Sequence, residues 1–314
     1  MARPGDWRGV FPSLPTVCTK TGEVDEEGQR SVVRFCLEGG ADGLACLLFA
    51  GEFYKFSDAE RSRVAGIVVD ECNGRVPVLV GVSHSGTLPS IELGLRAADA
   101  GADGVIVTPP YHANFLAEAS LSVRSHFEAV ASRLDLPVMI QDYETPGGVR
   151  LAASDLEGIA RASDNVRYVK IEGGDHLTRI RETRALLGDR MGVFGGMAGR
   201  YLLEELALGS QGSIPGAEMV DVLAEVFGAS RRGDRERAGP AFARLLPYLD
   251  FLVKHFDSFV AVEKEVLRAR GVIGSSTVRS PAVPLGADAT AALGSILREM
   301  GLSPGAGSRG PGAS

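Results

Sequence analysis

The chain has 314 residues, of which 45% are hydrophobic and 23% are charged, as in an ordinary globular protein with a large core. The formal net charge of −7 argues against the basic surface that a nucleic-acid-binding protein requires. No apolar run approaches the roughly 18 residues of a membrane span, and we expect no signal peptide because the first residues lack a long apolar stretch. The four cysteines show neither C-x-x-C spacing nor a disulfide framework, so we expect a cytoplasmic protein with reduced thiols.

Short β-branched runs alternate with longer stretches of helical spacing over the first 217 residues. Such alternation is typical of parallel strands joined by right-handed helical crossovers, and eight strands predict an α/β fold, the closed (β/α)8 TIM barrel. The predicted strands span residues 10–17, 43–49, 76–82, 104–109, 137–143, 166–172, 191–195 and 212–215. The predicted helices span residues 26–38, 58–72, 89–100, 117–134, 153–162, 177–187 and 200–208.

The strand signals stop after the barrel region, residues 1–217. Helical spacing at 221–230, 235–255, 258–270 and 288–300 predicts a helical C-terminal extension over residues 218–302, packed on the barrel. Residues 303–314 are rich in Gly, Ser and Pro, and we expect a disordered tail because they cannot bury apolar surface.

Polar residues gather at the ends of several predicted strands. In barrel enzymes the active site lies at the C-terminal ends of the strands, so these residues are the candidates for the chemistry. The second to seventh strands end in FAGE (49–52), SHS (83–85), TPPYH (108–112), QDY (141–143), KIEGG (170–174) and GGMAG (195–199).

Lys170 is the most informative of these residues because it interrupts the apolar strand VRYVKIE. Strand alternation puts it on the same face as Tyr168 and Glu172. A lysine pointing into a barrel costs desolvation free energy unless it is paired or used, and burial favours the neutral, nucleophilic amine. Two interpretations stay open: a nucleophile, and a structural lysine that is paired with Glu172 or Asp142 or is exposed at the strand end.

The order of AGE after the second strand, TPPYH after the fourth and VKIEGG on the sixth resembles the dihydrodipicolinate synthase/N-acetylneuraminate lyase family. The resemblance extends from Gly9 to about Leu302. It implies a cofactor-free class I aldolase or dehydratase in which Lys170 forms a Schiff base with the carbonyl of a 2-keto acid. It also implies that Tyr111 belongs to a proton relay that often reaches a neighbouring subunit, in a homo-oligomer built as a dimer of dimers.

The sequence departs from the pattern of that family in three places, one motif and two single residues. Its Gly-Thr-Thr-Gly-Glu motif is replaced by LFAGE at 48–52, so both threonine hydroxyls are missing while Gly51 and Glu52 remain. Gln141 stands in place of an acid/base tyrosine, which Tyr143 is a candidate to replace, and Pro146 stands in place of a carboxylate-binding arginine. These losses argue against dihydrodipicolinate synthase itself. The segments RGVFPSLPT, GRVPVLV, PPYH, LPVMIQD, YVKIE, GVIGS and PAVPL instead resemble the 2-keto-3-deoxy-L-arabonate dehydratase subgroup.

The resemblance predicts the dehydration of a 2-keto-3-deoxy sugar acid, such as 2-keto-3-deoxy-L-arabonate, to a keto-acid semialdehyde. Lys170 is the predicted Schiff-base residue, Tyr111 the proton relay, and Gln141, which cannot titrate, orients the substrate or a water molecule. Glu172 assists proton transfer or pairs with Lys170, and the pairing is the favoured interpretation. The predicted substrate-binding residues are Ala50, Gly51, Glu52, His84, His112, Tyr143, Glu172, Gly195, Gly196 and Ile214.

Other functions stay open beside the dehydratase. The same lysine chemistry serves a pyruvate-dependent aldolase, which breaks the C3–C4 bond instead of expelling the C4 hydroxyl. The missing threonines and tyrosine keep a non-catalytic keto-acid-binding protein open, and a metal-dependent aldolase is the remaining alternative. We predict no metal site, because the five histidines show neither HxH nor HxxEH spacing. A small-molecule 2-keto acid is the expected partner, with no nucleic acid and no membrane.

Overall fold

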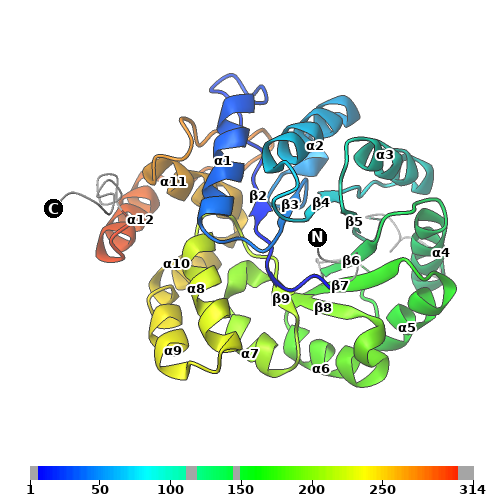
Figure 1. The fold of residues 1–314 in the computed structure, drawn as a ribbon. Coiled ribbons are helices and arrows are strands. Elements are labelled where there is room, and N and C mark those ends of the chain that lie inside the picture. The colour runs from blue at the N-terminus through cyan, green and yellow to red at the C-terminus, as the bar shows by residue number, and fades with distance from the viewer. Residues whose placement is uncertain (1–5, 111–118, 144–148, 303–314) are drawn as a thin grey trace.

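The computed structural model describes residues 6–110, 119–143 and 149–302, which form a curled parallel sheet surrounded by helices (Figure 1). Over these residues the sheet has nine short strands, and every neighbouring pair is parallel. The strands are β1 (Gly9–Val10), β2 (Ser13–Leu14), β3 (Leu44–Cys46), β4 (Val78–Gly81), β5 (Gly104–Val107), β6 (Val138–Tyr143), β7 (Val166–Glu172), β8 (Gly192–Gly195) and β9 (Gly212–Ser213). This architecture agrees with the predicted α/β class and is consistent with a TIM-barrel-like fold.

The first predicted strand, residues 10–17, is observed as two short strands on either side of Pro12. β1 pairs with β9 through Gly9↔Gly212, whereas β2 pairs with β3 through Ser13↔Ala45. The two outermost strands of the sheet therefore belong to one short segment, residues 9–14. Proline has no N–H to donate to a neighbouring strand, which explains the break between the two pairings.

Helices follow the strands and cover the outer surface of the sheet (Figure 1). They are α1 (Glu26–Glu38), α2 (Asp58–Cys72), α3 (Thr87–Asp99), α4 (Ala119–Ala131), α5 (Ala153–Ala162), α6 (His176–Leu187) and α7 (Leu202–Ala207). The predictions at 26–38, 58–72 and 153–162 have the observed bounds, and residues 117–118 of the predicted fourth helix lie outside the described residues. Local sequence sets these bounds: Ser57 and Glu60, for example, form a reciprocal capping box at the start of α2.

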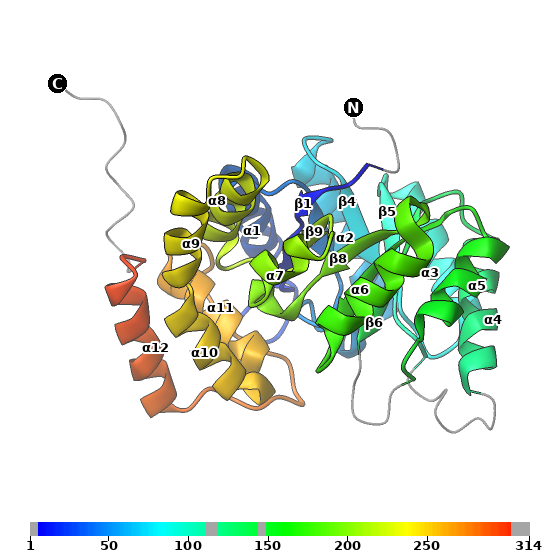
Figure 2. The ribbon, with the colours of Figure 1, turned by 90° about the horizontal axis from the view of Figure 1, so that it is seen from below.

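The C-terminal part is helical, as the sequence predicts. Its helices are α8 (Val220–Arg231), α9 (Arg235–Ala243), α10 (Leu246–Lys254), α11 (Phe259–Ala269) and α12 (Ala287–Glu299). The prediction of one helix over 235–255 is wrong, because Pro247 has no N–H to offer the carbonyl of Ala243 and the chain breaks into α9 and α10. Figure 2 shows these helices beside the sheet, where α8 contacts β1 and α1. The boundary at residue 217 and the disordered tail stay predictions.

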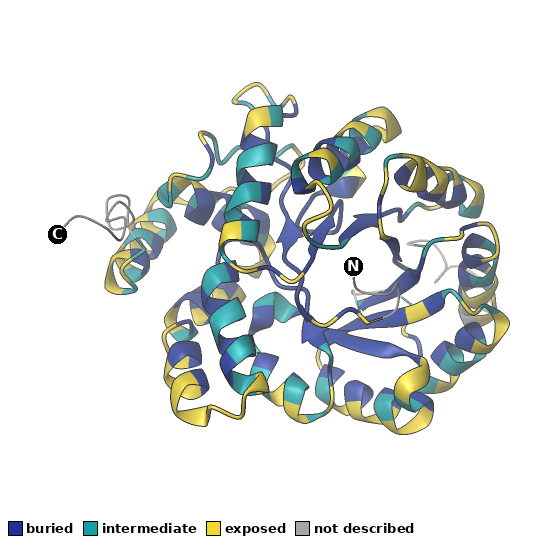
Figure 3. Ribbon diagram, in the orientation of Figure 1, coloured by how far each residue is buried: buried dark blue, intermediate teal, exposed yellow. Residues whose placement is uncertain are grey.

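The interior of the sheet is filled by one cluster of large, mostly apolar side chains. Trp7 stacks on Tyr168 with ring centroids 4.6 Å apart, and its backbone N–H donates to the Tyr168 hydroxyl over 3.0 Å. Figure 3 shows the strands mostly buried and exposed residues mainly on the outer faces of the helices. The other members of this inner cluster are Phe11, Ala45, Leu48, Leu79, Ile106, Met139, Phe194 and Ile214. Side chains two residues apart on a strand lie on the same face. On β6 the position after Met139 on this inner face is Gln141, and on β7 the position after Tyr168 is Lys170.

The four cysteines, Cys18, Cys36, Cys46 and Cys72, are buried free thiols. Burial raises the pKa of Cys36 well above its usual value and that of Cys46 to about 12, so both thiols stay protonated and unreactive. Within the described ranges, no helix combines the length and the apolar character needed to cross a membrane.

Glu205, on α7, is a carboxyl group buried against the outer face of β8. A Cβ on Gly195 would collide with this carboxyl group, so glycine is required where the helix approaches the strand. Burial raises the pKa of Glu205 to about 8, which keeps the side chain protonated at neutral pH. Gly195 therefore serves the packing of α7 against the sheet.

Replacing Glu205 with Gln is expected to change how stability depends on pH. Between the ordinary pKa of 4.5 and the folded value of about 8, the unfolded chain ionises this carboxyl while the folded chain keeps it protonated. The wild type therefore loses stability as pH rises through this window. The Glu205→Gln variant has no carboxyl group at this position, so this pH-dependent loss of stability is absent from it. Thermal unfolding from about pH 5 to about pH 8.5 should show the wild-type Tm falling relative to that of Glu205→Gln. Parallel curves would contradict the assignment of a neutral Glu205.

Candidate active site

Lys170 and Glu172 lie on the inner face of β7, two residues apart on the same side of the strand. The lysine Nζ is 2.8 Å from Glu172 Oε2, and only 5% of the lysine is exposed. Asp142, the other partner that the sequence suggested, pairs instead with Arg179 of α6. A buried amine at hydrogen-bond distance from a carboxylate can pass its proton across and become the nucleophilic free base.

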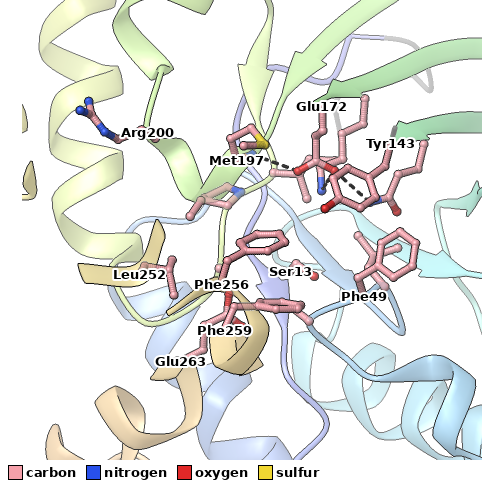
Figure 4. Close-up of a pocket in the computed structure, with 18 of the residues that line it drawn as sticks. Ser13, Phe49, Tyr143, Glu172, Met197, Arg200, Leu252, Phe256, Phe259 and Glu263 are labelled. Atoms are coloured by element: carbon pink, nitrogen blue, oxygen red, sulfur yellow. Dashed lines mark hydrogen bonds and ion pairs between the residues drawn. The ribbon is translucent and has the colours of Figure 1, made fainter. Parts of the chain in front are cut away.

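Glu172 is held in place by two further donors. Gln141 Nε2 donates to Oε2 over 3.1 Å, and the backbone N–H of Met197 donates to Oε1 over 2.9 Å (Figure 4). Gly196 permits this approach, since a Cβ at that position would collide with the Glu172 carboxylate. The carboxylate is thus fixed at both oxygens before any ligand binds.

The pairing of β6 with β7 brings Gln141 and Tyr143 beside the lysine and the glutamate. Gln141 stands opposite Lys170 and Tyr143 opposite Glu172 in the strand register. Burial, together with the charge of Glu172, raises the pKa of the Tyr143 hydroxyl, which therefore stays protonated and can donate. Strand pairing thus collects an amine, a carboxylate, an amide and a phenol at one end of the sheet.

The turn after β8 is strained where it meets the site. Met197 and Ala198 have φ angles of 46° and 55°, in the left-handed region that non-glycine residues rarely adopt, and both line the cavity beside Glu172. Such strain persists where the surrounding structure enforces it and is concentrated at functional sites. Here the strained turn carries the Met197 N–H that donates to Glu172.

A cavity of about 500 Å³ opens over these groups, a size that suits a small organic molecule (Figure 4). The predicted site residues that line it are Ala50, Gln141, Tyr143, Lys170, Glu172 and Ile214. Part of the remaining wall comes from the C-terminal helices and consists of Leu249, Leu252, Val253, Phe256, Phe259 and Glu263.

Other predicted site residues are not brought to the cavity. His84 is not part of its lining, and its Nδ1 accepts the backbone N–H of Gly86 over 3.0 Å. Among the described residues, no group of three or more His, Cys, Asp or Glu side chains could hold a metal ion. Two residues of the predicted set, Tyr111 and His112, lie outside the described residues, as does Pro146. The predicted residues that do not line the cavity are Gly51, Glu52, His84, Gly195 and Gly196.

Glu52 is tied to the C-terminal helices instead of facing the cavity. Its carboxylate lies 2.5 Å from Lys264 Nζ and 2.8 Å from Lys55 Nζ, and the side chains of Glu52 and Lys264 are completely buried. Lys264 also donates to the backbone carbonyl of Thr277. These contacts fix the loop after β3, which carries Ala50, to α11.

A pair of carboxyl groups that the sequence analysis missed, Glu218 and Glu263, lies beside the cavity, and Glu263 lines it. A Cβ on Gly216 would collide with both side chains, so the two groups lie close together. Glu218 accepts a hydrogen bond from the Tyr248 hydroxyl over 2.7 Å, whereas Glu263 Oε2 is buried without a partner among the described residues. Burial, and then the charge of Glu218, raises the pKa of Glu263 well above its usual value. This shift favours the protonated form of Glu263, the form that can act as an acid at the cavity wall.

A signal for Glu263 exists in the sequence. In α11 it falls among the buried residues Val260, Val262, Val266 and Leu267. A carboxyl group on the apolar stripe of an amphipathic helix costs free energy unless it has partners, so its presence there indicates a buried polar site.

Comparisons of the sequence and of the structure with known proteins agree on one family. The sequence pattern of the dihydrodipicolinate synthetase family matches residues 6–300. The chain is 31% identical to L-2-keto-3-deoxyarabonate dehydratase of Azospirillum brasilense over 93% of its length and 94% of that protein. It is 32% identical to 4-hydroxy-tetrahydrodipicolinate synthase of Sorangium cellulosum over 93% and 95% of the two chains. The crystal structure of YagE, a prophage protein from Escherichia coli K12 in complex with pyruvate, is similar with a TM-score of 0.85, 28% identity and coverage of 94% and 99%.

Replacing Glu52 with Gln is expected to destabilise the protein by about 3–5 kcal/mol, because it leaves Lys264 and Lys55 charged and buried without their shared carboxylate. Urea unfolding measures the loss. The double variant Glu52→Gln/Lys264→Met removes both members of the completely buried pair and should regain much of the loss, while Lys55 keeps its bond to the Arg279 carbonyl. An undiminished loss in the double variant would mean that the loop geometry, and not the unpaired charge, sets the cost.

Proposed function

The chain belongs to the dihydrodipicolinate synthetase family, a family of Schiff-base lyases, and we propose that Lys170 is its Schiff-base residue. The observation that carries the proposal is the buried Lys170–Glu172 pair, 2.8 Å apart at the cavity. The proposed substrate is a 2-keto acid bound with its ketone carbon against the Lys170 amine.

Schiff-base formation follows from the contacts around Lys170. Glu172 takes a proton from Nζ, the free amine attacks C2 of the keto acid, and the carbinolamine loses water to give an iminium ion. The iminium draws electrons from C3, so that a base removes a C3 proton and leaves an enamine. Glu172 is the proposed proton acceptor at this step, Gln141 orients it, and Tyr143 is a proposed hydrogen-bond donor beside it. Tyr111 keeps its proposed place in the relay.

The enamine then expels the C4 hydroxyl, which is the dehydration that the resemblance implies for a 2-keto-3-deoxy sugar acid. The departing hydroxyl needs a proton, and we assign the donor to Glu263, which lines the same cavity and whose Oε2 is buried without a partner among the described residues. Water hydrolyses the conjugated iminium, and the product leaves Lys170. With 2-keto-3-deoxy-L-arabonate, tautomerisation of that product gives 2-oxoglutarate semialdehyde. The name of the Azospirillum relative supports this class of reaction.

A pyruvate-dependent aldolase is the second candidate. It uses the same iminium, but a base takes the proton of the C4 hydroxyl and the C3–C4 bond breaks to leave the enamine of pyruvate. The pyruvate bound to YagE supports this alternative. The raised pKa of Glu263 favours elimination, because elimination requires an acid at C4 whereas cleavage requires a base there.

The proposal includes the architecture and assembly expected of such an enzyme. We infer that the curled sheet closes as a (β/α)8 barrel over residues 1–217, because β1 and β2 at its two edges belong to one short segment. Residues 218–302 form the helical extension. A cytoplasmic, cofactor-free dimer of dimers accords with family membership.

Borohydride reduction in the presence of pyruvate is expected to add one pyruvate-derived group to the protein, measured by intact mass. Lys170→Ala should abolish the adduct, because it removes the only proposed nucleophile. Lys254→Ala, at the exposed end of α10, is the matched control and should keep it. An adduct that survives in Lys170→Ala, or none in the wild type with either pyruvate or 2-keto-3-deoxy-L-arabonate, would overturn the proposal.

Replacing Glu263 with Gln preserves the shape of the side chain but removes its transferable proton. Turnover of a 4-hydroxy-2-keto acid should fall by about 100-fold or more, while borohydride trapping at Lys170 persists. Glu265→Gln serves as the control, since this neighbour on α11 pairs with Arg268 away from the cavity and should leave turnover unchanged. Wild-type turnover in Glu263→Gln would remove Glu263 from the reaction.

A further inference from the structure

The cavity has two chemically different ends. The polar groups around Lys170 and Glu172 occupy one end, at β6 and β7. The other end is a mostly apolar wall from α10, the short turn η5 (Phe256–Ser258) and α11, which also carries the carboxyl group of Glu263. Figure 4 shows the rings of Phe256 and Phe259 on this side of the cavity, with Leu252 beside them.

The side of the cavity next to β3 is apolar as well. Phe49 and Ala50 line it at the two positions where the family pattern has threonine. The Phe49 ring lies 5.5 Å from the Tyr143 ring, and Figure 4 shows it across the cavity from Phe256 and Phe259. Hydrocarbon therefore borders the space beyond the polar end on two sides.

The wall continues into solvent at the mouth of the cavity. Val253 and Phe256 are 59% and 46% exposed, although both are large apolar side chains. A contiguous exposed apolar surface beside a cavity is typical of a surface that an apolar group covers. A hydrocarbon group bound there would remove the surface of both side chains from water, which stabilises the complex.

Apart from the polar groups around Lys170, the lining has four polar side chains among the described residues: Ser13, Tyr54, Arg200 and Glu263. Arg200 contributes to the lining, but its guanidinium is paired with Asp250 at 3.4 Å and Figure 4 shows it turned away. Hydroxyl groups placed against Leu252 and Phe259 would lose their hydrogen bonds to water without replacement. This surface discriminates against a polyhydroxylated chain.

We propose that the substrate is a 2-keto acid whose chain beyond C4 is apolar, an alkyl or aryl group seated against Leu252, Phe256 and Phe259. The inference rests on the proposed Schiff-base function and keeps its reaction class, but it replaces the sugar-acid tail with hydrocarbon. The ketone then lies at Lys170 and the tail on the wall. In the cleavage direction the same wall holds an apolar aldehyde.

A matched pair of substrates tests this. 4-Hydroxy-2-oxohexanoate carries a methyl group where 2-keto-3-deoxy-L-arabonate carries its C5 hydroxyl, and both retain the C4 hydroxyl that either reaction needs. The readout is the rate at which the substrate disappears, measured by liquid chromatography. This rate includes both elimination and cleavage. We expect kcat/KM to be at least about tenfold higher for the hexanoate, and higher still for 4-hydroxy-2-oxo-4-phenylbutanoate.

Two variants link the preference to the wall. Phe256→Ser and Leu252→Asn should each lower the hexanoate-to-arabonate ratio of kcat/KM by about tenfold and leave borohydride trapping of pyruvate unchanged. Leu88→Asn is the control, because Leu88 on α3 is 61% exposed and does not line the cavity, and it should leave the ratio unchanged.

The outcomes separate this inference from the Schiff-base proposal. A preference for the sugar acid with intact trapping at Lys170 would overturn the apolar tail and leave the Schiff base standing. A Phe256→Ser variant that changes the sedimentation coefficient but not the ratio would assign the wall to a contact between subunits and likewise overturn it. No trapping with pyruvate, and no turnover of any of these acids, would overturn both.

Discussion

The ion pair between Lys170 and Glu172 lies directly beyond an interior that is otherwise filled by Trp7, Tyr168 and a ring of apolar side chains. Two charges in such a place cost desolvation free energy, so their remaining hydrogen-bonding capacity has to be satisfied. Gln141 and the Met197 N–H supply those bonds for Glu172. The strained turn after β8 and the glycine before it are consequences of this requirement, since both bring backbone against the Glu172 carboxylate.

Three buried carboxyl groups, Glu172 and Glu263 at the cavity and Glu52 outside it, differ because their neighbours differ. The neighbours of Glu172 are an amine and an amide, those of Glu52 are two lysines, and the neighbour of Glu263 is a second carboxyl group. Opposite charge stabilises an ionised carboxylate, whereas burial beside a like charge keeps one protonated. The roles proposed for these three groups, a proton acceptor, a structural anchor and an acid, therefore follow from their environments and not from residue type.

Strand periodicity explains which parts of the site could be predicted from sequence. Lys170, Glu172, Gln141 and Tyr143 lie on two paired strands with a repeat of two, and an alternation along the chain is enough to put them on one face. The same rule separates Gly195, which meets Glu205 outside the sheet, from Gly196, which meets Glu172 inside. The two glycines are equivalent in the sequence motif. They differ in the side of the sheet that each one faces.

The parts that escaped prediction depend on contacts between distant segments or on helix ends. A break at Pro247 separates α9 from α10, and helical spacing alone does not reveal how the second helix is then directed. Glu263 was predicted only as part of a helix, because its role depends on Glu218 and on the cavity that α11 meets. Glu52 was assigned to the ligand on the strength of its motif, yet Lys264, more than two hundred residues away, takes its carboxylate.

The division between strands and extension bears on how specificity is built. The proposed Schiff-base lysine and the groups around it sit on β6 and β7, whose register fixes them relative to one another, whereas the apolar wall and the proposed acid Glu263 sit on α10, η5 and α11. The buried Glu52–Lys264 pair ties α11 to the loop after β3, so the wall keeps its position relative to Lys170. Side chains on the wall can then change without disturbing the amine or the carboxylate. Relatives of similar identity that carry the names of a dehydratase and a synthase accord with such an arrangement, in which the strands hold the shared iminium chemistry and the helices select what is attached to it.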